Sequence, residues 1–203
     1  MLKATAQTVG EATRTRIVQA ALATVKKEGF AGTSARSIAA TGGFNQALIF
    51  YHFGSLHGLL LAALAESSQE RLAAYSTVVA ACEGLEDLAR VAGETYREDL
   101  KSGHVTVVSE MIAGSLTHPE LKGPIAELMK PWLHFSEQVV TRFLGDSPFG
   151  QLLPPRAVAH AIVAFYLGLE QMSHLNGETN EAEPLFEAGA QLATLLGPLF
   201  KPS

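Results

Sequence analysis

The sequence predicts an all-α protein of about nine helices, in which short helices joined by tight turns precede a body of longer ones. Apolar residues recur three and four positions apart along most of the chain, and no strand-like alternation of any length occurs. Glycines at positions 29, 32, 42, 43, 54 and 58 punctuate the first sixty residues, whereas all nine prolines lie at or beyond Pro119. The first sixty residues therefore differ in organisation from the rest.

Three short helices are expected before residue 54. The first follows Thr13, a suitable N-cap, and ends at Gly29. Its apolar face is formed by residues at helical spacing: Ile17, Ala20, Ala21 and Val25. Thr33 or Ser34 can cap the second helix and Asn45 the third. The Gly42-Gly43 pair breaks the chain between them, because glycine adopts a left-handed turn without steric clash.

The rest of the chain is expected to form longer helices. Ser55 can cap a fourth helix that extends to about Tyr75. Further apolar stripes predict helices over residues 85–96, 105–114 and 125–143, and Pro131 predicts a kink or a break in the last of these. A helix over 155–176 is apolar on most of its circumference, so it must be buried on most of it. A final helix is expected over 184–196, with Pro184 in its first turn.

Charge is distributed unevenly along the chain. The whole chain has a net charge of −5, but residues 1–53 hold six basic and two acidic side chains, a net charge of +4, and residues 54–203 have a net charge of −9. A basic N-terminal segment attracts the phosphates of nucleic acid, and the acidic remainder is repelled by them. The charge pattern predicts a nucleic-acid-binding N-terminal part joined to a part with another role.

We expect the protein to be cytoplasmic, without a membrane segment. The single cysteine, Cys82, allows no internal disulfide, which fits a reducing compartment. Residues 1–10 lack the apolar run of a secretory signal, and the densest apolar run, 59–65, is too short to cross a bilayer.

Enzyme motifs are missing from the sequence. It contains no phosphate-cradling glycine loop, no zincin motif and no nucleophile elbow of the G-x-S-x-G type. Its seven histidines include no pair at the i, i+4 spacing of a metal-binding helix with a carboxylate nearby. We therefore expect no enzyme activity, no cofactor and no metal site. Conversion of an offered small molecule by the purified protein would overturn this expectation.

Residues 33–53 have the layout of a helix-turn-helix, in which two short helices meet at a glycine turn and the second enters the major groove of DNA. The entering helix begins with Asn45, Gln46 and Ala47. Glutamine can pair with an adenine edge through two hydrogen bonds, and alanine is small enough to meet a thymine methyl group. Leu48, Ile49 and Phe53 lie on the other side, where they would pack against the first helix of the motif.

These residues resemble the N-terminal signature of the TetR family of repressors. The resemblance covers about residues 11 to 60, without a gap, and is carried by Thr33, Ile38-Ala39, Gly43-Phe44-Asn45-Gln46-Ala47, Ile49-Phe50-Tyr51-His52-Phe53, Gly54-Ser55 and Leu59. It implies an all-α fold: an N-terminal three-helix bundle with the helix-turn-helix (residues 1–54), followed by a larger helical ligand-binding and dimerisation domain (residues 55–203). The remaining residues match the family only in helical character and length.

The resemblance also implies which residues contact double-stranded DNA. Base-reading positions correspond to Arg36, Asn45, Gln46 and Ala47, and phosphate-contacting positions to Thr33, Tyr51, His52 and Ser55. Ser34 is a further expected DNA-binding residue. The chain departs from the usual pattern at Phe50, where the family has tyrosine, and at Leu56, where it has lysine. We expect a smaller salt dependence of DNA binding, by about one phosphate contact per subunit. His57 could partly replace the lysine. Arg14 and Arg16 either reach toward the DNA backbone or belong to a solvated helix face.

For the larger domain, the resemblance implies a homodimer that buries the segments 155–176 and 184–199 against a second copy. The two recognition helices of the dimer would lie about 34 Å apart, so the operator is expected to be a near-palindrome. A small-molecule effector, largely apolar or aromatic, would bind within the bundle. The candidate ligand-binding residues are Tyr96, His104, Met111, Trp132, Phe135 and Phe165, with Glu110 or His134 as further polar partners. Effector binding would shift the population toward a form of the dimer in which the distance between the two N-terminal domains no longer matches the spacing of successive major grooves.

Two alternatives stay open at this point. Phe50 and Leu56 would suit a protein-interaction or effector-sensing module whose DNA affinity is weakened. An activator would carry the same motifs as a repressor.

Overall fold

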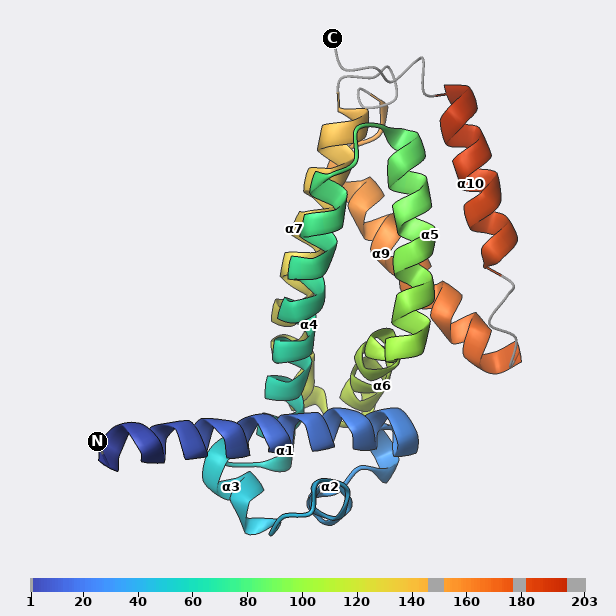
Figure 1. Ribbon diagram of the computed structural model, residues 1–203. Helices are drawn as coiled ribbons and strands as arrows, with labels where there is room; N and C mark the ends of the chain where they lie inside the picture. Colours follow the sequence, from blue (N-terminus) through green and yellow to red (C-terminus); the bar gives the residue numbers. More distant parts are fainter. Residues whose placement is uncertain (1, 146–151, 177–181, 197–203) are drawn as a thin grey trace. The chain divides into compact units, whose positions relative to one another are not determined.

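The computed structural model describes residues 2–145, 152–176 and 182–196, and all regular secondary structure within these ranges is helical (Figure 1). They contain nine α-helices and one short 3₁₀ helix. The elements are α1 (Leu2–Gly32), α2 (Ala35–Gly42), α3 (Ala47–Phe53), α4 (Leu56–Ala80), α5 (Leu85–Ser102), α6 (His104–Thr117), η1 (Pro119–Leu121), α7 (Lys122–Leu144), α9 (Pro155–Asn176) and α10 (Glu183–Leu196). The all-α prediction is confirmed.

The chain divides into two compact units. Residues 1–68 and 106–127 form the first, called the head unit here, and residues 69–105 and 128–203 form the second, called the body unit. The chain passes from one unit to the other within α4, near the start of α6 and within α7. The head unit thus holds the first half of α4, most of α6 and η1 in addition to α1–α3. The functional boundary expected after residue 54 stays a prediction.

Helix α1 is longer than the sequence predicted. It begins at Leu2, so Thr13 lies within the helix and the prediction of an N-cap there is wrong. No proline interrupts the first twelve residues, and alanine favours continuation of a helix. At the other end the prediction is confirmed, because Gly29 has a positive φ of 70° and interrupts the helical backbone.

Local hydrogen bonds define the two short helices that follow. Ser34 caps α2, accepting from the backbone N–H of Ser37 while the Ser37 hydroxyl accepts from the Ser34 N–H, a reciprocal capping box. Gly43 ends α2 in the left-handed conformation. Asn45 Oδ1 accepts from the N–H of Ala47 at 2.9 Å, although Gln46 is the residue that directly precedes α3. The amide of Asn45 therefore starts α3 as predicted, with the helix boundary displaced by one residue.

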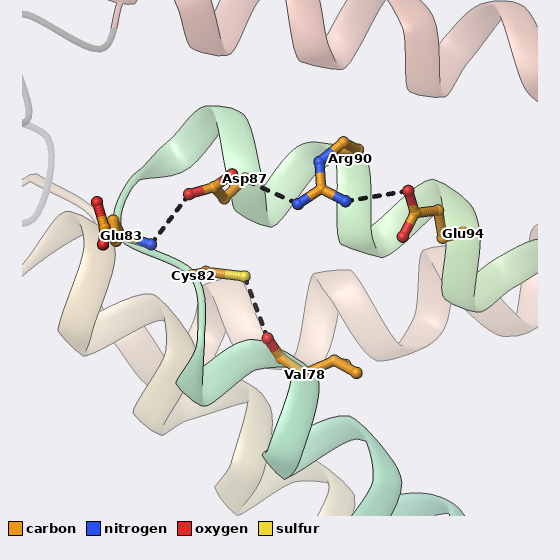
Figure 2. Close-up of polar contacts among 6 residues, drawn as sticks. All are labelled: Val78, Cys82, Glu83, Asp87, Arg90 and Glu94. Atoms are coloured by element: carbon orange, nitrogen blue, oxygen red, sulfur yellow. Dashed lines mark hydrogen bonds and ion pairs between the residues drawn. The ribbon is translucent and has the colours of Figure 1, made fainter.

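Helix α4 begins as predicted, because Ser55 Oγ accepts from the Gly58 N–H at 2.9 Å. It continues to Ala80, beyond the expected end near Tyr75. The following turn leads into α5, where Asp87 accepts from the Glu83 N–H and the Cys82 thiol donates to the Val78 carbonyl (Figure 2). Arg142 of α7 donates to the carbonyl oxygens of Val79 (2.9 Å) and Cys82 (2.7 Å), which satisfies the C-terminal end of α4.

The α4–α5 turn also fixes the state of two side chains. Burial, reinforced by the nearby Asp87 carboxylate, raises the pKa of the Cys82 thiol. Arg90 forms ion pairs with Asp87 and Glu94 along α5 (Figure 2). Hydrogen bonds to Glu94, which has the larger effect, and to Asp87 raise the pKa of the Arg90 guanidinium. Cys82 therefore stays a neutral thiol at neutral pH.

The C-terminal helices match the predicted segments. Pro131 lies within α7, which continues to Leu144, so this proline does not break the helix. Helices α9 and α10 begin within one residue of the expected positions, and residues 197–199 of the predicted final segment lie outside the described residues. Helix α10 packs along α5 (Figure 1). Gly93 of α5 leaves room there for the side chain of Phe186.

No single helix in the described part of the chain is both long and apolar enough to cross a membrane. The pair α3 and α4, bent by 65°, passes that test jointly by length and composition alone.

Candidate functional sites

The helix-turn-helix in the head unit is held together by apolar residues on one side of each short helix. Ile38 of α2 and Ile49 of α3 are fully buried. Gly42 makes the turn possible, because a Cβ there would lie 2.2 Å from the ring of Phe44 and 2.8 Å from the Cβ of Ala20. A side chain larger than hydrogen at this position would push the turn away from α1. The Thr24 hydroxyl, 3.1 Å from that of Thr41, provides a polar link between α1 and α2.

The opposite side of α3 faces solvent. The predicted base-reading residues Asn45, Gln46 and Ala47 are all exposed, as is Arg36 on α2. Tyr51 retains 80% of its surface, and its ring meets that of His52 edge-on at 5.0 Å between centroids. Helix α3 thus presents a polar tip and an aromatic side chain outward while Ile49 anchors it to the core.

Exposure differs among the other predicted DNA-binding residues. Ser34 and Ser55 are exposed and His52 is half-buried. Thr33 retains only 9% of its surface, and its hydroxyl donates to the Gly29 carbonyl at 2.6 Å. The structure thus gives Thr33 an intramolecular role at the α1–α2 junction.

The two arginines of α1 contact neighbouring side chains in the head unit. Arg14 forms an ion pair with Glu66 of α4 and lies over the Phe53 ring, 5.1 Å from its centroid. Arg16 lies over the ring of Phe44, 5.7 Å from its centroid. Both guanidinium groups hold α1 against the helix-turn-helix by cation–π contacts.

A cluster of aromatic side chains in the body unit surrounds Tyr75 of α4. Its ring meets Trp132 edge-on at 5.2 Å between centroids and lies 6.5 Å from Phe135, both on α7. The buried His104 lies 5.8 Å from the same tryptophan, and the Tyr75 hydroxyl is 3.2 Å from that of Tyr166 on α9. Three of the predicted ligand-binding residues therefore belong to one cluster, in which Tyr75 contacts Trp132 and Phe135, and Trp132 contacts His104.

Buried charges lie directly beside this cluster. Asp99 of α5, which retains 1% of its surface, pairs with Arg71 of α4 and accepts a hydrogen bond from the Tyr166 hydroxyl. Burial raises the pKa of Tyr166, although the positive charge of Arg71 opposes this effect. Tyr96 is also buried, with its hydroxyl 3.0 Å from that of Ser173 and its ring edge-on to Tyr166.

Two predicted ligand-binding residues lie elsewhere. Met111 is fully buried in α6 and belongs to the head unit. Phe165 retains 52% of its surface on α9, on the same exposed face as Ala161 and Gly168.

Sequence reasoning missed Arg71, Tyr75, Asp99 and Tyr166 as members of the body-unit cluster. Asp99 did leave a signal, because it follows Tyr96 by three residues and so continues the apolar face of its helix. A carboxylate on a buried face requires a partner, and Arg71 provides it. Nothing in the sequence linked those two helices.

Comparison with known proteins bears on both units. The sequence model of the family described as bacterial regulatory proteins, tetR family, matches residues 17–63, which span the helix-turn-helix and the start of α4. No curated protein matches the chain. Many solved structures do, and those named below are transcriptional regulators or ligand-binding proteins.

A TetR transcriptional regulator from Legionella pneumophila is similar with a TM-score of 0.71 and 17% identity, over 88% of this chain and 95% of the other. The transcriptional regulator FadR from Bacillus subtilis, solved in complex with stearoyl-CoA, has a TM-score of 0.73 at 15% identity, over 93% and 99%. The multidrug binding protein EbrR, complexed with imidazole, has a TM-score of 0.61 at 26% identity, over 92% and 90%. Residues 17–63 therefore match the N-terminal domain of the tetR family of bacterial regulatory proteins, and the helices described here have the fold of the solved regulators.

Proposed function

We propose that this protein is a ligand-responsive transcriptional repressor in the cytoplasm, which binds a near-palindromic operator as a homodimer. One observation carries the proposal: the start of α3 exposes Asn45, Gln46 and Ala47, while Ile49 of the same helix is fully buried. A helix that enters a major groove exposes polar and small residues at its N-terminal end and packs its opposite face against the protein core.

The exposed side chains suggest a division of roles on DNA. Gln46 pairs with an adenine edge and Ala47 contacts a thymine methyl group, so these two residues read sequence. Tyr51, Ser34 and Ser55 bind phosphate and fix the position of the helix. Thr33, whose hydroxyl donates to Gly29, contributes by holding the α1–α2 junction.

An exposed apolar surface supports the homodimer. On α9, Ala161, Ile162, Phe165 and Met172 are exposed, and on α10 so are Leu185, Leu192 and Leu195. In each helix these residues recur at helical spacing, so they form a stripe. Such stripes on a soluble protein mark an interface, and burial against a second copy accounts for the all-round apolarity of α9.

The body-unit cluster around Tyr75 supports effector binding. Trp132, Phe135 and Tyr96 offer aromatic faces. The buried Asp99, its half-buried partner Arg71 and the buried His104 offer polar groups. An effector of largely apolar or aromatic character with one polar group suits this combination. FadR with stearoyl-CoA and EbrR with imidazole are ligand complexes of this fold.

The proposed mechanism is a population shift. Helix α4 belongs to both units: its first turn, capped by Ser55, lies in the head unit, and Tyr75 lies in the body unit. Because the first turn of α4 approaches DNA, a change in packing around Tyr75 acts on a helix that takes part in DNA binding. The effector shifts the equilibrium only by its difference in affinity between the two forms.

The experiment that tests the function is selection of oligonucleotides from a random pool, followed by anisotropy titrations at several salt concentrations. We expect enrichment of a near-palindrome. Gln46→Ala should weaken binding to the selected site by about five- to a hundred-fold, corresponding to about 1–3 kcal/mol, and leave non-specific binding unchanged. Glu86→Ala on the exposed first turn of α5 is the matched control.

The competing function, a protein-interaction module, predicts a different result. No sequence would then be enriched, and Gln46→Ala would bind DNA as the unmodified chain does. That outcome would contradict the proposal.

A further inference from the structure

Three side chains of types that commonly bind metals meet in the head unit, although His57 is far from the other two, His118 and Glu120, in the sequence. His57 lies in the first turn of α4, His118 immediately precedes η1, and Glu120 lies within η1. One donor atom from each lies within 4.8 Å of the other two. Nδ1 of His57 is 3.4 Å from Glu120 Oε1, and Nδ1 of His118 is 3.5 Å from the same oxygen.

We propose that His57, His118 and Glu120 form a binding site for a divalent transition-metal ion, with Zn²⁺ as the best fit. Zinc lies about 2.0–2.2 Å from nitrogen and oxygen ligands, so two ligand atoms of a tetrahedral site are about 3.4 Å apart. The two imidazole-to-carboxylate distances already have this length. Small inward rotations of the side chains would complete the coordination.

The donor set selects among ions. Two imidazoles and one carboxylate suit zinc and its first-row neighbours, whereas magnesium and calcium prefer an all-oxygen site. Three protein ligands leave the fourth position of a tetrahedral ion to water. The Glu120 side chain retains 60% of its surface and that of His118 42%, so solvent reaches the site.

The site is backed on one side by an aromatic ring. Phe30 stacks on the His57 ring at 6.2 Å between centroids and lies 5.5 Å from that of His118. Gly114 of α6 makes room for this ring, because a Cβ there would lie 2.5 Å from Phe30. The apolar backing orients both imidazoles and limits water access from that side, as hydrophobic surroundings do at metal sites.

A bound ion would join the start of α4 to the segment between α6 and α7. His57 lies two residues beyond Ser55, the cap of α4, so the ion would fix the turn between α3 and α4. The inference goes beyond the proposed function, since it concerns a second ligand of the head unit that binds without DNA or effector. It also departs from the expectation drawn from histidine spacing, which considered only neighbours within one helix.

The competing interpretation is a plain cluster in which the Glu120 carboxylate bonds to two imidazoles without metal. Zinc binding distinguishes the two. The full-length protein, freed of metal by chelation, is titrated with Zn²⁺ against a chromophoric competitor chelator, and Co²⁺ is used as a spectroscopic probe of tetrahedral geometry. We expect one ion per chain, and with Co²⁺ the visible absorption of a tetrahedral complex.

Variants decide whether the ion occupies this cluster. His118→Gln and Glu120→Gln should each weaken zinc binding by at least about tenfold. Glu120→Gln is the safer of the two for folding, because the side chain is largely exposed, and circular dichroism checks both. His134→Gln, at an exposed histidine of α7, is the matched control and should bind as the unmodified protein does.

Stability provides a second readout. Saturating Zn²⁺ should raise the unfolding midpoint of the unmodified protein but not that of Glu120→Gln, because an ion that binds only the folded form stabilises it. Zinc binding that survives both substitutions, or that is absent from the unmodified protein, overturns the proposal. Neither result bears on DNA recognition, so the proposed function stands or fails separately.

Discussion

The backbone N–H of Phe30, one residue after the break in α1, donates a hydrogen bond of 2.7 Å to Oε2 of Glu110 on α6. The break itself makes this contact possible, because Gly29 has a φ of 70° and a Cβ at that position would lie 3.0 Å from the same carboxylate oxygen. Glu110 therefore satisfies a donor that the interrupted helix leaves without an intrahelical acceptor. The sequence suggested Glu110 as a polar contact of an effector, and the geometry gives it a structural role in the head unit.

Removal of this carboxylate should destabilise the head unit. In Glu110→Ala the Phe30 N–H loses its acceptor in a partly buried position, which costs about 1–3 kcal/mol in the free energy of unfolding. Urea denaturation measures this change. Glu11→Ala removes the same charge from an exposed position of α1 and serves as control. Equal stability of the two variants would show that the contact contributes nothing.

The fold was predictable because its signals are local. Ser34, Gly43 and Ser55 each mark a helix end through hydrogen bonds or backbone conformation within a few residues, and all three have the expected role. The prediction that Thr13 caps the first helix was wrong because it considered this residue without those before it. A threonine caps a helix only where the helix starts, and the residues before Thr13 already favour helix.

The site was only partly predictable, because its members meet through tertiary contacts. The exposed tip of α3 follows from helical periodicity and could be placed from sequence. The Arg71–Asp99 pair joins α4 to α5, and the His57–His118 pair joins α4 to the segment before η1. Spacing within one helix does not report such pairs.

A lysine introduced at position 56 should strengthen DNA binding. Leu56 begins α4, next to the exposed Ser55, where the family has a cation. Leu56→Lys adds one phosphate contact per subunit, so the slope of log affinity against log salt should steepen by about 0.9 per subunit. Anisotropy titrations with the selected oligonucleotide measure the slope. Leu116→Lys, at an exposed leucine of α6, controls for net charge, and an equal effect in that variant would contradict a local contact.

A charge on the exposed face of α9 should separate the proposed dimer. Phe165 retains 52% of its surface and lies among small residues, so Phe165→Glu would bury two carboxylates in a twofold interface. We expect light scattering after size exclusion to report a monomer, with unchanged helical content by circular dichroism. Leu116→Glu, outside α9 and α10, should remain dimeric. A dimeric Phe165→Glu would exclude this face as the interface.

Tyr166 should make the protein less stable at alkaline pH. Its pKa is raised in the folded state by burial, whereas the unfolded chain ionises at the ordinary tyrosine pKa of about 10. Below pH 10 both states keep the phenol protonated and the group adds no pH dependence. Above pH 10 the unfolded state loses the proton first, so the free energy of unfolding falls with rising pH, by up to about 1.4 kcal/mol per pH unit.

The phenylalanine variant isolates this contribution. Tyr166→Phe loses the hydrogen bond to Asp99 and should be less stable by about 1 kcal/mol or more at neutral pH, but its stability should decline less steeply above pH 10. Tyr51→Phe, at a tyrosine that retains 80% of its surface, should follow the unmodified protein throughout. Urea titrations at a series of pH values measure both curves. Parallel decline of the unmodified protein and Tyr166→Phe would mean that Tyr166 ionises in the folded protein as readily as in the unfolded chain, and that the phenol is therefore not held in the protonated form beside Asp99.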